Sequence, residues 1–253
     1  MGTWISHLRI AEKLLEKRPN LEPIPFTFGS LAPDSGIPNE DSSKFDPPKE
    51  VTHFLFRGEG EAHIRDWQFL ERHLKGASAD TDPERYSFLL AYYAHLICDI
   101  LWVKNINVTT HRDFKTDFAE KGNRFWWKIK EDWYGLDILY VQDHLQSLFW
   151  RVFMAEPTPF SYLDFLPQAA INQQMERIRR FYSQPEPEWL VERPYPYLNE
   201  TSMSRFVDNA VAAIEYILDN LESLPEGVSA VSLLPEELTE PFPSPLGDPI
   251  DGE

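Results

Sequence analysis

Residues 86–103 form the apolar run that most constrains how this chain can fold. Asp82 can cap a helix there, and Pro83 suits the first helical turn, where its missing N–H is not needed. Because the run is apolar on every side, it predicts a helix buried at the centre of the domain. His95 and Asp99 interrupt it, and their i,i+4 spacing places both side chains on one face of that helix.

The His95–Asp99 pair has two interpretations. A carboxylate inside an apolar helix is costly unless something compensates its charge. A divalent metal ion would do so directly, and His-x-x-x-Asp on a helix is good ligand spacing. The other interpretation is a single buried His–Asp hydrogen bond that orients the core. The choice between them depends on whether other ligand types point to the same place.

Composition limits the class of protein. At 253 residues, with 42% apolar and 14% aromatic residues, the chain can form one large globular domain. Its net charge of −17 argues against non-specific binding to nucleic acid or to an anionic membrane. With one cysteine and no signal-peptide pattern, we expect a cytoplasmic protein without internal disulfide bonds. We also expect the apolar run to be too short to span a bilayer.

Other inward-facing polar residues lie in the first third of the chain. Residues 3–17 have helical periodicity, and His7 falls on their apolar side. Residues 18–51 form a long, Pro-rich connection, which we expect to be an anchored loop because it also carries apolar side chains. This loop holds Asp34 in a turn, and the short apolar run after it holds His53. Taken singly, each of these residues is more often structural than a ligand.

The rest of the chain has helical patterns and no convincing strand pattern. Further helices are predicted at residues 61–75, 114–134, 135–154, 161–183 and 201–224. Residues 105–113, which carry His111, are predicted to be a polar loop. We therefore predict an all-α fold, a single domain of about six to eight helices with long loops, over residues 1–224. Residues 225–253 form an acidic, Pro-rich tail that we expect to pack poorly, so deletion from about residue 234 should leave the fold intact.

Together, the inward polar residues form a candidate metal-ligand set. Its members are His7, Asp34, His53, His95 and Asp99. Three imidazoles and two carboxylates suit zinc, and manganese or iron are also possible. One ion needs three or four ligands, so five suggest two ions that share a carboxylate. A set without cysteine is more typical of a catalytic site than of a structural zinc.

The order of these residues resembles the zinc-dependent phospholipase C superfamily, which also includes single-strand-specific nucleases. The resemblance spans roughly residues 3–103. It is carried by three segments: Thr3-Trp-Ile-Ser-His-Leu-Arg-Ile-Ala, Phe28-Gly-Ser-Leu-Ala-Pro-Asp-Ser-Gly and Tyr93-Ala-His-Leu-Ile-Cys-Asp. It implies an all-helical fold and hydrolysis of a small phosphoester at a cluster of one or two zinc ions.

The resemblance also implies roles for the candidate ligands. Those of one ion would be Asp34, His53, His95 and Asp99. A second ion would be held by His7 and Asp99, with Asp99 bridging. Asp34 would act as the general base if it does not bind a metal. The catalytic residues it implies are therefore Asp34 and Asp99.

The chain departs from the family pattern at a further metal site. In the family that site uses another histidine and then a His-x-x-x-Glu or His-x-x-x-Asp pair. His111 could supply the first ligand, but His144 is followed at this spacing by Leu148. Whether His111, Asp143 or His144 joins a further site is left open. Two ions are the better-supported expectation.

Two other functions compete with hydrolysis. The first is a non-catalytic helical metal-binding protein with a degenerate phospholipase C-like site. The second is a di-iron carboxylate oxidase, which requires two Glu-x-x-His pairs. Neither His95 nor His144 has a glutamate three residues before it, so we rank the oxidase last.

Overall fold

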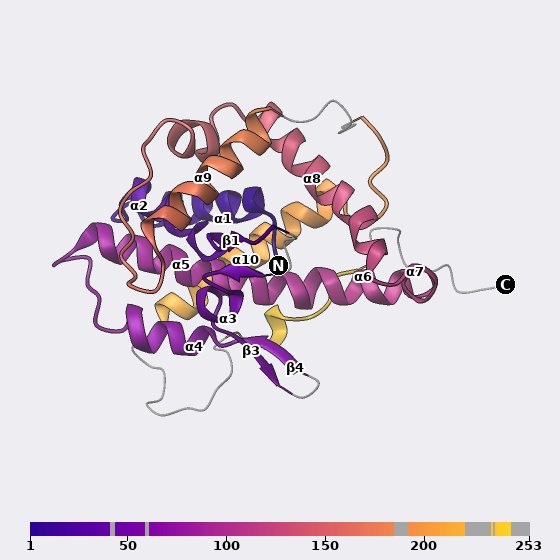
Figure 1. Cartoon of the computed structure of the whole chain (residues 1–253), viewed down its shortest axis with the longest axis horizontal. Helices are drawn as coiled ribbons and strands as arrows, with labels where there is room; N and C mark the ends of the chain where they lie inside the picture. The colour runs from indigo at the N-terminus through magenta and orange to yellow at the C-terminus, as the bar shows by residue number, and fades with distance from the viewer. Residues whose placement is uncertain (41–43, 59–60, 185–191, 221–233, 235, 244–253) are drawn as a thin grey trace.

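The computed structural model describes residues 1–40, 44–58, 61–184, 192–220, 234 and 236–243. The prediction of an all-α fold with loops is confirmed, and Figure 1 shows the other helices arranged around the long helix α5. The helices are α1 (Trp4–Lys17), α2 (Pro23–Gly29), α3 (Lys49–Thr52), α4 (Asp66–Phe69), α5 (Pro83–Leu101), α6 (Val108–Asp113), α7 (Lys115–Lys121), α8 (Phe125–Asp143), α9 (Gln168–Ser183) and α10 (Glu200–Asp219).

Shorter elements join these helices. Short 3₁₀- or π-helical turns lie at η1 (Ala32–Asp34), η2 (Leu70–Leu74), η3 (Trp102–Asn107), η4 (Gly122–Arg124), η5 (Phe149–Phe153) and η7 (Glu236–Leu238). Two small antiparallel hairpins, which the sequence pattern did not predict, pair β1 (Ile37–Pro38) with β2 (Phe45–Asp46) and β3 (Leu55–Gly58) with β4 (Glu61–Ile64).

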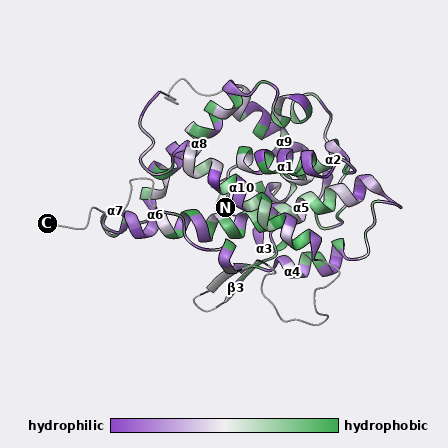
Figure 2. Ribbon diagram, turned by 180° about the vertical axis from the view of Figure 1, so that it is seen from behind, coloured by the Kyte–Doolittle hydropathy of each residue, from purple (hydrophilic) through white to green (hydrophobic). Residues whose placement is uncertain are grey.

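Helix α5 forms the centre of the core, as predicted. The Asp82 side chain caps it by accepting a hydrogen bond from the Arg85 amide at 3.1 Å. Residues on all its sides are buried, and helices α1, α2 and α10 pack against it. Figure 2 shows hydrophobic and hydrophilic residues interspersed along the surrounding helices α8 and α9, as expected of helices with one buried side.

The helix that contains α5 is longer than the apolar run suggested. α5, η3 and α6 form one continuous helix of 31 residues, so the prediction of a polar loop at residues 105–113 is wrong. This helix is long and apolar enough to cross a membrane, which corrects the expectation that it is too short. However, 83% of its most apolar window is buried inside the molecule, as in the core helix of a globular domain. It is therefore only weak support for a membrane span.

Other predicted boundaries also change. Residues 23–29 of the expected loop form α2, because Pro23 occupies the first helical turn, where proline is tolerated. The prediction of an anchored loop is confirmed, since Phe26, Phe28 and Leu31 are buried. The predicted helix over residues 61–75 is instead strand β4 followed by the short helical turns α4 and η2.

Part of the C-terminal tail packs against the domain, so the expectation of poor packing is wrong for this part. The Asn105 side-chain amide donates hydrogen bonds to the carbonyl oxygens of Leu238 (3.3 Å) and Glu240 (2.6 Å). Thr109 donates to the Phe242 carbonyl at 2.6 Å, and the Phe242 ring is buried. Residues 225–233, 235 and 244–253 of the predicted tail, and residues 221–224 of the last predicted helix, lie outside the described residues.

Candidate metal centre

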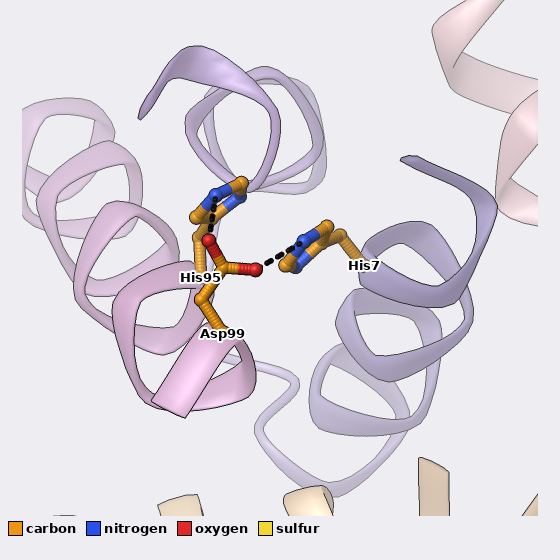
Figure 3. A group of neighbouring side chains, drawn as sticks. All are labelled: His7, His95 and Asp99. Atoms are coloured by element: carbon orange, nitrogen blue, oxygen red, sulfur yellow. Dashed lines mark ion pairs between the residues drawn. The ribbon is translucent and has the colours of Figure 1, made fainter. Parts of the chain in front are cut away.

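His7, His95 and Asp99 meet where helix α1 faces α5. Figure 3 shows His95 and Asp99 projecting from one helix toward His7 on the other. His7 Nε2 lies 3.4 Å from Asp99 Oδ1, and His95 Nε2 lies 3.7 Å from Asp99 Oδ2. The two imidazole rings stack at 3.8 Å between centroids. Potential ligand atoms of all three residues lie within 4.8 Å of one another.

Asp34 and His53 complete the cluster from the connection between α2 and β3. His53 Nε2 lies 3.3 Å from Asp34 Oδ1 and 3.5 Å from Asp99 Oδ2. Asp34, His53 and His95 form a second group of ligand atoms within 4.8 Å of one another. The structure thus brings together all five residues that the sequence singled out. Asp99 Oδ1 faces His7, while Oδ2 faces His53 and His95.

Neighbouring groups fix the orientation of the His95 and His53 imidazoles. His95 Nδ1 donates to the Ser30 carbonyl oxygen at 2.8 Å, which leaves Nε2 as the nitrogen that can accept a metal ion. His53 Nδ1 is hydrogen-bonded to Thr52 Oγ1 at 2.9 Å. The Tyr92 hydroxyl of α5 donates to the Thr52 carbonyl oxygen and so ties this segment to the central helix.

The two carboxylates are held by groups near the N-terminus. The Gly2 amide donates to Asp99 Oδ1 at 2.7 Å, and the Trp4 indole Nε1 donates to Asp34 Oδ2 at 3.0 Å. Lys49 Nζ lies 3.9 Å from Asp34 Oδ1. Asp34 therefore keeps Oδ1 directed at His53 while the Trp4 indole occupies Oδ2, and Asp99 keeps Oδ2 free for His53 and His95 while the Gly2 amide binds Oδ1. This arrangement is typical of ligands oriented by outer contacts.

The spacing of these atoms fits a metal ion better than it fits hydrogen bonds. The imidazole–carboxylate distances are 3.3–3.7 Å, whereas good N–H···O bonds are about 2.7–3.2 Å. Ligands bound tetrahedrally at about 2.0–2.2 Å would stand roughly 3.3–3.6 Å apart. Five buried atoms of the cluster lack a hydrogen-bond partner among the described residues: His7 Nδ1, His7 Nε2, His53 Nε2, His95 Nε2 and Asp99 Oδ2. The residues present therefore fit a bound divalent cation.

The electrostatics of the cluster also suit metal ligands. Burial, reinforced by the neighbouring His95, lowers the pKa of His7 to about 4, and burial likewise lowers the pKa of His53. Burial opposes charge on Asp99 as well, but the Met1 amino group and His95 outweigh it and hold the pKa of that carboxyl well below its usual range. His7 and His53 are therefore neutral and Asp99 ionised, as metal binding requires.

Burial opposes charge on Asp34 and His95 as well, but neighbouring groups outweigh burial at both residues. The hydrogen bond from His53 and the charge of Lys49 lower the pKa of Asp34. The charge of Asp99 raises the pKa of His95. A metal ion at His95 Nε2 would therefore compete with a proton for that nitrogen.

Residues considered for other sites do not join the cluster. His111 stacks on Phe118 at 4.0 Å, and His144 stacks on Tyr140 at 4.1 Å. Neither histidine, nor Asp143, belongs to a group of potential metal ligands in the described ranges. Glu50, which does lie three residues before His53, is exposed and pairs with Arg57 at 2.7 Å. The cluster thus lacks the glutamates that a di-iron oxidase needs.

A cavity of about 730 Å³ adjoins the cluster at Asp34. Sequence reasoning missed the aromatic and basic side chains of its wall, among them Trp4, Lys49, Lys130, Trp133, Tyr134 and Arg177. A signal was present on α8, where Trp127, Lys130 and Tyr134 share one helix face at i, i+3 and i+7. The cavity makes the cluster accessible to a small molecule from the Asp34 side.

Comparison with family models, with curated proteins and with solved structures finds no match for this chain. The resemblance to the zinc-dependent phospholipase C superfamily therefore rests on the three segments quoted above.

Proposed function

We propose that the protein is a metal-dependent phosphoester hydrolase that uses zinc, with manganese or iron as alternatives. The observation that supports it most directly is the convergence of His7, Asp34, His53, His95 and Asp99, with unpartnered ligand atoms, at one end of a cavity. Zinc or a similar ion would supply a bound water of lowered pKa and positive charge for the developing phosphoryl oxygens.

The contacts of His95 and Asp99 limit how the ligands would divide between two ions. His95 has one free nitrogen, Nε2, because Nδ1 donates to the Ser30 carbonyl, so it can serve one ion only. Asp99 directs Oδ1 to His7 and Oδ2 to His53 and His95. It is therefore the residue placed to bridge two cations.

Asp34 is the carboxylate that faces the cavity, and its side chain is 12% exposed. The Trp4 indole N–H fixes one of its oxygens, and the other lies beside His53. If Asp34 does not bind a metal ion, it can accept the proton of the attacking water. In either role it orients the reaction toward the cavity, where the substrate would bind.

The first test is metal content. Protein purified without chelator is analysed by elemental mass spectrometry and then assayed on phosphomonoesters, phosphodiesters and nucleotides with added zinc, manganese or iron. We expect one or two bound ions per chain and turnover of at least one ester. Bound metal without turnover would favour the non-catalytic metal-binding protein. Absence of metal under every condition would contradict both functions and favour a packed His–Asp core.

The second test is Asp99→Asn. Asparagine keeps the shape of the side chain but loses the charge that would neutralise two cations, so we expect loss of one ion and a fall in kcat of roughly 10²-fold or more. Asp137→Asn is the matched control, since Asp137 is another buried carboxylate and lies outside the cluster. Far-ultraviolet circular dichroism of both variants separates loss of activity from loss of fold. Equal activity of Asp99→Asn and wild type would contradict the proposal.

A further inference from the structure

The cavity beside Asp34 concentrates positive charge in a chain whose net charge is −17. Lys49, Lys130 and Arg177 line it, and among the described residues of the wall Asp34 is the one acidic side chain. An adjoining cavity of about 580 Å³ shares Arg177 and adds Arg180 and Glu176. A basic pocket in an acidic chain predicts an anionic ligand, because walls of one sign concentrate the counter-charge.

Two of these cations are not neutralised by the protein. Lys49 lies near Asp34, but within the described ranges neither Lys130 nor Arg177 forms an ion pair. Lys128, the other lysine of the same helix, is paired with Glu131 at 2.5 Å. Holding unpaired cations beside a proposed metal centre is electrostatically unfavourable unless an anion binds there.

The same two cations lie against two aromatic rings of the wall. Lys130 lies 4.9 Å from the centre of the Trp127 ring, and Arg177 lies 5.8 Å from that of Trp4. Aromatic rings can recognise a quaternary ammonium group by cation–π contact. Here protein cations already lie against the Trp127 and Trp4 rings, so a choline-like group at either ring would meet like charge.

A third wall residue offers an unused hydrogen-bond donor. Trp133 is buried, and its indole Nε1 has no acceptor in the part of the chain that the structure describes. Buried tryptophan N–H groups usually find a partner. An oxygen-bearing ligand in the cavity could provide one, independently of the lysine and arginine charges.

We propose that the cavity binds a small phosphoester that carries a second anionic group, a carboxylate or a further phosphate, held by Lys130 and Arg177. This inference rests on the proposed function, because the scissile phosphate would lie at the metal centre and the second anion at these cations. It predicts that esters with a cationic alcohol group are poor substrates. The chain's net charge of −17 disfavours a polyanionic polymer.

Binding is measured first, so that the test does not depend on turnover. The full-length protein as purified is titrated calorimetrically with three phosphonates of similar size: 3-phosphonopropionate, propylphosphonate and 3-aminopropylphosphonate. We expect 3-phosphonopropionate to bind about tenfold more tightly than propylphosphonate, which corresponds to about 1.4 kcal/mol. The amino compound should bind most weakly. Equal affinities, the reverse order, or no binding by any of the three would overturn the proposal.

Substitutions identify the residues responsible. Lys130→Gln and Arg177→Gln should each remove most of the preference for the second anion and leave the affinity for propylphosphonate within about twofold. Lys128→Gln, on the same helix but paired with Glu131 at the surface, is the matched control and should keep the full preference. Circular dichroism confirms that each variant is folded. A preference that survives in the double variant would contradict the assigned site.

Kinetic assays then separate this inference from the proposed function. Three p-nitrophenyl phosphodiesters are compared whose second alcohol is glycolate, ethanol or choline, and kcat/KM should fall in that order. Turnover with equal or reversed preference would overturn the anion site and leave the hydrolase intact. No turnover with the binding preference intact would remove the hydrolase and leave an anion-binding site. Tighter binding of oligothymidylate than of 3-phosphonopropionate would overturn the choice of a small ligand.

Discussion

The stability of this fold should fall with rising pH because of one buried carboxyl group. Asp137 on α8 is 2% exposed, and its oxygens accept hydrogen bonds from Thr3 Oγ1 at 2.8 Å and from the Tyr182 hydroxyl at 2.6 Å. Burial outweighs these two hydrogen bonds and raises the pKa of Asp137 to about 7. Its ordinary value is 3.8. Between these two pKa values, the folded state therefore holds a proton on Asp137 that the unfolded chain has lost.

The sign of the effect follows from proton linkage. Between the unfolded pKa of 3.8 and the folded pKa of about 7, the folded state binds more protons, so the free energy of unfolding decreases as pH rises. Between pH 5 and pH 8 the folded Asp137 loses its proton, while the unfolded carboxyl is ionised throughout. The full slope applies over the two pH units from pH 5 to the folded pKa of about 7. At about 1.4 kcal/mol for each unit, the free energy of unfolding falls by about 2.7 kcal/mol. Above about pH 7 no further loss is expected from this group.

Urea denaturation of wild type and Asp137→Asn at pH 5 and pH 8 tests this. From pH 5 to pH 8, the free energy of unfolding of wild type should fall by about 2–3 kcal/mol more than that of the variant, because asparagine cannot titrate. The difference between the two proteins removes the pH dependence of the histidine cluster, which both share. Asp143→Asn, a change at an exposed position of the same helix, should track wild type. Equal losses in wild type and Asp137→Asn would refute the reasoning.

Three further predictions concern packing and metal. Gly29→Ala should lower the free energy of unfolding by about 1–3 kcal/mol in urea, because a Cβ there collides with the Phe88 backbone of α5; unchanged stability would contradict this close approach. Asn105→Ala should cost about 1–3 kcal/mol by the same assay, since it removes the side-chain donor to the carbonyl oxygens of Leu238 and Glu240; a silent variant would show that this segment is not docked. Prolonged dialysis against a chelator should lower the Tm by several degrees, and zinc should restore it; a Tm unaffected by either would contradict metal binding.

The centre of the fold was predictable because local and tertiary signals agree there. The Asp82–Pro83 start and the apolar run both indicate a helix, and α5 begins at Pro83. Periodicity also placed His7 on the inward side of α1, where it meets Asp99. The convergence of His53 and Asp34 on the same point was expected only from the order of motifs, because periodicity says nothing about residues on a long connection.

The parts that could not be predicted depend on distant contacts. Residues 105–113 look like a loop because they are polar, yet Asn105 and Thr109 are polar in order to bind the backbone of residues 238–242. A donor whose acceptor lies more than a hundred residues away leaves no local pattern. In the same way, the prolines before Phe26 suggested a loop, although the first helical turn tolerates proline.

The choice between a packed His–Asp core and a metal centre is the step on which the function depends, and the geometry bears on it directly. A core pair that served only packing would close to hydrogen-bond distance, since an unsatisfied buried polar group costs about 1–3 kcal/mol. Instead, Asp99 is fully buried and stands 3.4–3.7 Å from three imidazoles at once, and none of the three contacts is a hydrogen bond. His7 and His95 also stack face to face at 3.8 Å, an arrangement that two protonated rings would resist. His7 and His53 are neutral beside an ionised Asp99, so this carboxylate needs positive charge close to it, and a divalent cation bound by the imidazole nitrogens and by Asp99 would supply it.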